Sequence, residues 1–214
     1  WWDMTERREL TSVTCDEMRL DCVNCLSDCR RAIVFFSHGK LYTDPVQSRH
    51  YLLCPDEPPR LVLEADGFFC SHVQGCPTEP DMYAYDRWPS PQRYIDQPQH
   101  LRTLDGSFDQ PVPLTSDALR PAVMFGGRDH YVWTPDGSRL VSYLCPHPFE
   151  VEPDFDHYKL KWCLSATDWR TGEDLAAEYP PGRWGGHMQV TPDSRYIVCG
   201  GAPGFDNLFA VEIE

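Results

Sequence analysis

Three histidines hold the same place in a repeated segment, and their chemistry suits metal binding or proton transfer. His72, His130 and His187 each stand five positions before a turn proline. Imidazoles change charge near neutral pH and are common ligands of divalent transition metals. If the repeats surround one axis, the three rings would converge on one channel, and the alternative is that each ring only hydrogen-bonds a neighbouring carbonyl. The other histidines share no such register, and we expect them on the surface or in loops: His38, His50, His100, His147 and His157.

The elements that would position these histidines are copies of one strand–turn–strand unit. Residues 130–141 and 187–198 are close copies, 72–85 is a looser copy, and 23–36 is a degenerate one. The three histidines are 58 and 57 positions apart. Each copy reads as a strand, a Pro-Asp-Gly type turn and a second strand rich in β-branched and aromatic residues, and a third strand and a polar hairpin follow. Four short strands in each unit of about 50 residues are typical of a β-propeller blade.

The sequence therefore predicts an all-β chain that forms one β-propeller domain over residues 1–214. About four blades are expected, near 15–56, 67–112, 123–180 and 185–214, with 1–13 as an outer strand or hairpin. These blades either belong to a longer propeller or close a small four-bladed ring, in which 1–13 would complete the last blade. In both cases the first strand of each blade is the innermost one, so the three histidines would face the channel.

Composition limits the partners that this chain can have. The 214 residues carry a formal net charge of −14, from 19 basic and 33 acidic side chains. Such an acidic surface repels nucleic acid and anionic membranes, so we expect neither as a partner. It also disfavours an anionic sugar unless basic side chains gather at the site. No run of about 18 apolar residues is present, so no membrane-spanning segment is expected.

Ten cysteines require an explanation. Cys22, Cys25 and Cys29 are closely spaced, and Cys15 or Cys54 could supply a fourth ligand for zinc or an iron–sulfur cluster. No second Cys-x-x-Cys pair completes such a pattern. Scattered, partly buried thiols in a reducing compartment are the better interpretation, and they favour a cytoplasmic protein without metal at this cluster.

Several of these segments resemble oligogalacturonate lyases. Residues 127–137, Gly-Arg-Asp-His-Tyr-Val-Trp-Thr-Pro-Asp-Gly, are similar to the His-Glu-Phe-Trp-x-Pro-Asp-Gly segment of that family. Residues 179–181 followed by 186–188 resemble its Pro-Pro-x-x-His-x-Met segment, and residues 71–73 with 94–96 also run parallel to it. The resemblance covers most of the chain through short motifs.

The resemblance implies a seven-bladed propeller that holds Mn²⁺ near the channel mouth and splits acidic oligosaccharides. His187 matches a metal-binding histidine of the family, and His130 matches the histidine that acts in proton abstraction. His72 would contact the substrate. A family arginine has no direct match here; Arg102 and Arg93 are the nearest catalytic stand-ins, and Arg93 could also bind the substrate.

The activity implied is metal-assisted β-elimination across C4–C5 of oligogalacturonides, a step in pectin degradation. A metal ion and an arginine would neutralise the uronate carboxylate, and a base would then remove the C5 proton. The alternative function is a non-catalytic propeller of the TolB-like or WD40-like kind, which serves as a binding platform, because this fold alone implies no activity.

Overall fold

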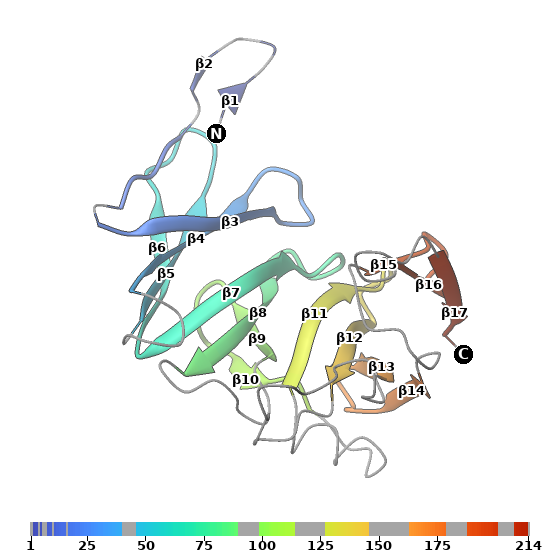
Figure 1. Ribbon diagram of the computed structural model, residues 1–214. Coiled ribbons are helices and arrows are strands. Elements are labelled where there is room, and N and C mark those ends of the chain that lie inside the picture. Colours follow the sequence, from blue (N-terminus) through green and yellow to red (C-terminus); the bar gives the residue numbers. More distant parts are fainter. Residues whose placement is uncertain are drawn as a thin grey trace. The chain divides into compact units, whose positions relative to one another are not determined.

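The computed structural model (Figure 1) contains β-strands joined by turns, and no helix, among the residues that it describes. The described residues are 11–15, 17–39, 46–89, 99–113, 127–145, 163–178, 188–200 and 208–213, with short pieces at 2–3, 5 and 8–9. Every strand pairing within them is antiparallel, which agrees with the all-β prediction. None of these residues belongs to a helix that could cross a membrane.

The chain divides into two compact units, which are described separately. The first unit comprises Trp1–Arg93 with Pro98–Pro111, and the second comprises Tyr94–Gln97 with Val112–Glu214. The single propeller domain expected over 1–214 therefore stays a prediction.

The first unit contains two four-stranded sheets, each with its strands in sequence order. The first sheet consists of β3 (Arg19–Cys25), β4 (Ala32–His38), β5 (Gln47–Leu53) and β6 (Arg60–Asp66). The second sheet consists of β7 (Phe68–Gly75), β8 (Met82–Pro89), β9 (Gln99–Thr103) and β10 (Asp109–Pro111). Both are meanders, in which each strand pairs with the next along the chain. The strand β6 lies beyond the bounds expected for the first blade.

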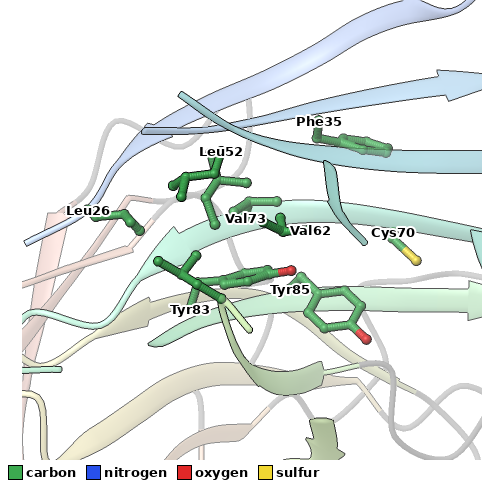
Figure 2. Packing of buried hydrophobic residues seen from close by; sticks show 10 residues of the cluster. Leu26, Phe35, Leu52, Val62, Cys70, Val73, Tyr83 and Tyr85 are labelled. Carbon is green, nitrogen blue, oxygen red and sulfur yellow. The ribbon is translucent and has the colours of Figure 1, made fainter. Parts of the chain in front are cut away.

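A shared core lies between these two sheets. Figure 2 shows Phe35 and Leu52 of the first sheet packed with Tyr83 and Tyr85 of the second. All four side chains are buried. The close approach requires a glycine at position 75, because a Cβ there would lie 3.0 Å from the Cα of Leu26. The two sheets of the first unit are therefore packed face to face.

The second unit repeats this organisation. Its third sheet consists of β11 (Gly127–Trp133), β12 (Arg139–Cys145), β13 (Cys163–Asp168) and β14 (Asp174–Glu178), again in sequence order. Its fourth sheet has three described strands, β15 (Met188–Val190), β16 (Tyr196–Gly200) and β17 (Leu208–Glu212). Tyr143 and Leu164 of the third sheet share a core with Met188 and Ile197 of the fourth.

The first hairpin of the third sheet is fixed by the side chains of its turn. The carboxylate of Asp136 accepts hydrogen bonds from the Thr134 hydroxyl at 2.6 Å and from the Ser138 amide at 3.0 Å. The Thr134 hydroxyl in turn accepts one from the Arg139 amide at 3.0 Å. Asp193 and Thr191 make the equivalent contacts in the fourth sheet. The repeated Thr-Pro-Asp motif thus forms the same turn twice, as its residue types predict.

The N-terminal residues form a small hairpin of their own. The strand β1 (Trp2–Asp3) pairs with β2 (Arg8–Glu9), with Trp2 opposite Glu9. The expectation that residues 1–13 belong to a blade as an outer strand or hairpin stays a prediction.

Candidate functional site

The first strand of each four-stranded sheet contains a β-bulge at nearly the same place. In β7 the register shifts between Ser71 and Gln74, so His72 lies in the bulge. In β11 it shifts between Asp129 and Tyr131, so His130 is the bulged residue. The β3 bulge, between Leu20 and Cys22, holds Asp21 instead. Bulges redirect side chains and are frequent next to active sites, which makes these positions the candidate functional positions.

His72 is held in an unusual conformation by a buried carboxylate. Its φ is +50°, a left-handed value that is uncommon for a non-glycine residue and costs about 1–3 kcal/mol. Its Nδ1 lies 2.6 Å from Oδ2 of Asp86 on β8. The His72 side chain is 45% exposed, whereas that of Asp86 is fully buried. Nδ1 donates this hydrogen bond, because an ionised carboxylate can only accept.

Asp86 belongs to a row of polar residues that crosses the second sheet. It pairs directly with Ser71 on β7 and with Gln99 on β9, so the three side chains share one face. All three are buried. The Ser71 hydroxyl finds no hydrogen-bond partner among the described residues. Buried polar groups are normally hydrogen-bonded, so the unpaired Ser71 hydroxyl is an exception. It belongs to the residue that precedes His72.

Arg102 lies in a polar network between the two sheets of the first unit. Its Nη1 is 2.5 Å from Oδ2 of Asp109 on β10, and its Nη2 donates to the Val62 carbonyl on β6 at 2.8 Å. Tyr85 also donates to Asp109, at 2.9 Å. Burial alone would raise the pKa of Asp109, but hydrogen bonds from His100, Tyr85 and Arg102 outweigh it and lower that pKa. Through these contacts Arg102 links the two sheets, which is a structural role. Its catalytic role stays a prediction.

His50 is a core residue, so its expected place on the surface or in a loop is wrong. It lies in the interior of β5 and is fully buried. Its Nε2 donates to the Cys70 carbonyl at 3.0 Å, and its Nδ1 accepts from the Tyr83 hydroxyl at 3.3 Å. Burial lowers the pKa of His50 to about 4, so the ring is neutral at pH 7. Sequence alone gave no signal for this, because the ring takes an ordinary inward position of a strand.

The remaining predicted site residues are only partly covered by the structure. His130 is described through the backbone of β11, while Arg93 and His187 lie outside the described residues. Among the described residues, no group of three or more His, Cys, Asp or Glu side chains is placed to hold a metal ion. Cys22 packs against the core of the first unit, and Cys25 and Cys29 are exposed.

Comparison with known proteins finds solved structures with a similar fold. No protein-family model matches the sequence, and no curated protein matches it. Among solved structures, an oligogalacturonate lyase in complex with manganese matches 99% of this chain with a TM-score of 0.71 and 16% identity. This chain spans 55% of the length of that lyase.

Peptidases are also similar in fold, over smaller parts of their own length. The Pyrococcus horikoshii acylaminoacyl peptidase matches 86% of this chain with a TM-score of 0.57 and 12% identity. Prolyl oligopeptidase B from Galerina marginata matches 93% with a TM-score of 0.54 and 16% identity. The chain covers 28% and 30% of these two proteins. At such identities the likeness shows the fold relationship alone: the chain shares its repeated antiparallel sheets with these enzymes.

Proposed function

We propose that this protein is a β-propeller lyase that acts on oligogalacturonides or closely related acidic oligosaccharides. The observation that carries the proposal is the place of His130: a bulge in the first strand of its sheet, within the segment that resembles the lyases. The fold likeness to an oligogalacturonate lyase over 99% of the chain supports it. The proposed compartment is the cytoplasm, and neither nucleic acid nor a membrane is proposed as a partner.

The propeller arrangement is supported by the first sheet, which has apolar side chains on both faces. Along β4, Ile33 and Phe35 face the second sheet, whereas Val34 and Phe36 lie on the opposite face. That opposite face contains an apolar groove of about 400 Å³, bordered by the exposed side chains of Leu20 and Val23. In a propeller each blade packs between two others, and both of its faces must be apolar.

The proposed reaction removes a proton and a leaving group from neighbouring carbons of a uronic acid. His130 takes the C5 proton as general base, and the electron pair of that C–H bond forms the C4=C5 double bond. The C4–O bond breaks as this double bond forms, and its electrons leave with the glycosidic oxygen, which takes up a proton. An arginine, Arg93 or Arg102, would pair with the uronate carboxylate and lower the cost of removing the C5 proton. His72 and Arg93 are proposed to contact the substrate.

A divalent metal, Mn²⁺, is part of the proposal through His187. When bound, such an ion would neutralise charge on the uronate carboxylate. The described residues supply no set of metal ligands, so the proposal assigns one ligand, His187, and routes no step through the ion.

The direct test is product formation from oligogalacturonate. The unsaturated product has a C4=C5 double bond conjugated with its carboxylate, which absorbs in the near ultraviolet. We expect this absorbance to rise when the protein is incubated with substrate and Mn²⁺, and to become insensitive to Mn²⁺ in His187→Ala. No absorbance from oligogalacturonate at any metal concentration would exclude the lyase.

The second candidate is a non-catalytic binding propeller. It is favoured by the spread of similar folds over proteins with different activities, a lyase and peptidases among them. This candidate predicts that the protein binds an acidic oligosaccharide or another partner and leaves it chemically unchanged.

A further inference from the structure

Arg87 on β8 is a partly buried arginine that has no counter-charge among the described residues. Its Nε is buried and finds no hydrogen-bond partner there. The ion pairs within those residues use other arginines instead: Arg19, Arg31, Arg49, Arg102, Arg139 and Arg195. A buried donor on a charged group is costly to leave unpaired. In a chain with 33 acidic and 19 basic side chains, such a guanidinium requires an explanation.

The ring of Phe68 on β7 fixes the orientation of this guanidinium. Cζ of Arg87 lies 4.2 Å from the centroid of the Phe68 ring, which packs against the core of the first unit. A guanidinium that is stacked on an aromatic ring uses its face for that contact, and its N–H groups lie in its own plane, directed away from the ring. The stacking therefore holds these N–H groups in position for an acceptor.

Two acidic side chains lie on the strands of this sheet, and both are engaged elsewhere. Asp86 precedes Arg87 but lies on the opposite face of β8, because successive side chains of a strand alternate, and it accepts a hydrogen bond from His72. Asp109 on β10 is paired with Arg102. Neither carboxylate therefore balances the charge of Arg87.

We propose that Arg87 binds the carboxylate of a ligand, at a site that belongs to the first unit alone. A planar carboxylate can accept two parallel hydrogen bonds from a guanidinium, and such charge-assisted bonds are among the stronger ones in proteins. A singly charged carboxylate also suits a chain of net charge −14 better than a doubly charged phosphate, which the surrounding field repels more. The inference goes beyond the proposed lyase and does not depend on it, because no residue of the second unit takes part.

The test follows the Nε–H signal of Arg87 by nitrogen-15 NMR of the whole protein. Acetate is the probe, acetamide is its neutral counterpart, and inorganic phosphate is the competing anion, all at constant ionic strength. The signal is assigned by its loss in Arg87→Lys, or by through-bond correlation in the wild type if that variant does not fold. The matched control is Arg60 at the start of β6, which is exposed and has no ion pair among the described residues.

We expect acetate to shift the Arg87 signal along a saturating curve, with a midpoint in the millimolar range, and acetamide to leave the signal in place. The Arg60 signal should show no saturation, because water already solvates that side chain. A response of Arg87 that matches Arg60, or no response to acetate, would overturn the site. Phosphate that binds as tightly as acetate would overturn the assignment to a carboxylate. The absence of lyase activity would leave each of these results unchanged, so the two proposals can fail separately.

Discussion

Nδ1 of His50 on β5 lies 3.3 Å from the hydroxyl of Tyr83 on β8, so this hydrogen bond links the two sheets of the first unit inside their core. The neutral ring is required for it, since Nδ1 accepts while Nε2 donates to the Cys70 carbonyl. Protonation of His50 would place an uncompensated charge in a fully buried position.

The first prediction is a loss of stability in mild acid that depends on His50. Burial lowers the pKa of His50 to about 4, below its ordinary value of about 6.5. The unfolded chain therefore binds the proton first, and stability falls as the pH drops from about 6.5 to 4. Between pH 7 and 5 this one group should cost about 2 kcal/mol. Urea unfolding at both pH values measures it, and His50→Gln should remove that part of the pH dependence, whereas the exposed His38→Gln should not.

The second prediction concerns the carboxylate of Asp109. Asp109→Asn should destabilise the first unit by about 3 kcal/mol, because the partly buried Arg102 guanidinium loses its counter-charge. Glu64→Gln removes a partner of Arg49 in an exposed ion pair and should cost less than about 1 kcal/mol. Urea unfolding at pH 7 compares the two variants. Equal costs would mean that the Asp109 network contributes no more than a surface pair.

The third prediction uses two glycines with the same backbone conformation. Gly67 and Gly106 both have a φ of +75°, so alanine at either position should cost about 1 kcal/mol through the backbone. A Cβ on Gly67 would meet nothing within 4 Å, whereas one on Gly106 would lie 2.7 Å from Nη2 of Arg102. That nitrogen donates to the Val62 carbonyl. Gly106→Ala should therefore cost about 1 kcal/mol more than Gly67→Ala, as measured by denaturant midpoints.

The fourth prediction separates the thiols by exposure. Cys25 and Cys29 are exposed and should react with iodoacetamide in the native protein, while Cys70, Cys76 and Cys199 are buried and should not. Burial raises the pKa of Cys70 to about 12, which suppresses its reactive thiolate as well. Mass spectrometry of the digested protein after brief labelling measures the extent of reaction at each cysteine. Protection of Cys25 together with stoichiometric zinc or iron would instead indicate a metal at the cysteine cluster.

The strands and turns could be predicted from sequence because their signals are local. Alternating apolar residues and the Thr-Pro-Asp turns define β11, β12, β15 and β16 without knowledge of distant contacts. The strand β6 lies outside the bounds expected for the first blade, which end at residue 56. Only the pairing of β5 with β6 assigns it to the first sheet.

The partners of the predicted site residues could not be found in the same way. Asp86 reaches His72 through the register of β7 and β8, and a bulge shifts that register by an amount that no local pattern reveals. Arg102 likewise contacts Asp109 and Val62 on two other strands. Residue type indicated which side chains could take part in chemistry. Strand pairing decided which of them are hydrogen-bonded to other side chains or to the backbone.

The central claim is that His130 is the base of a lyase, and one measurement tests it most directly. The initial rate of near-ultraviolet absorbance from oligogalacturonate should be compared for the wild-type protein, His130→Ala and the control His38→Ala. We predict a steady rise for the wild type and for His38→Ala, and a loss of about a hundredfold or more for His130→Ala. A rate for His130→Ala that equals the wild-type rate would contradict the assignment of the base, and no rise for the folded wild type would contradict the lyase.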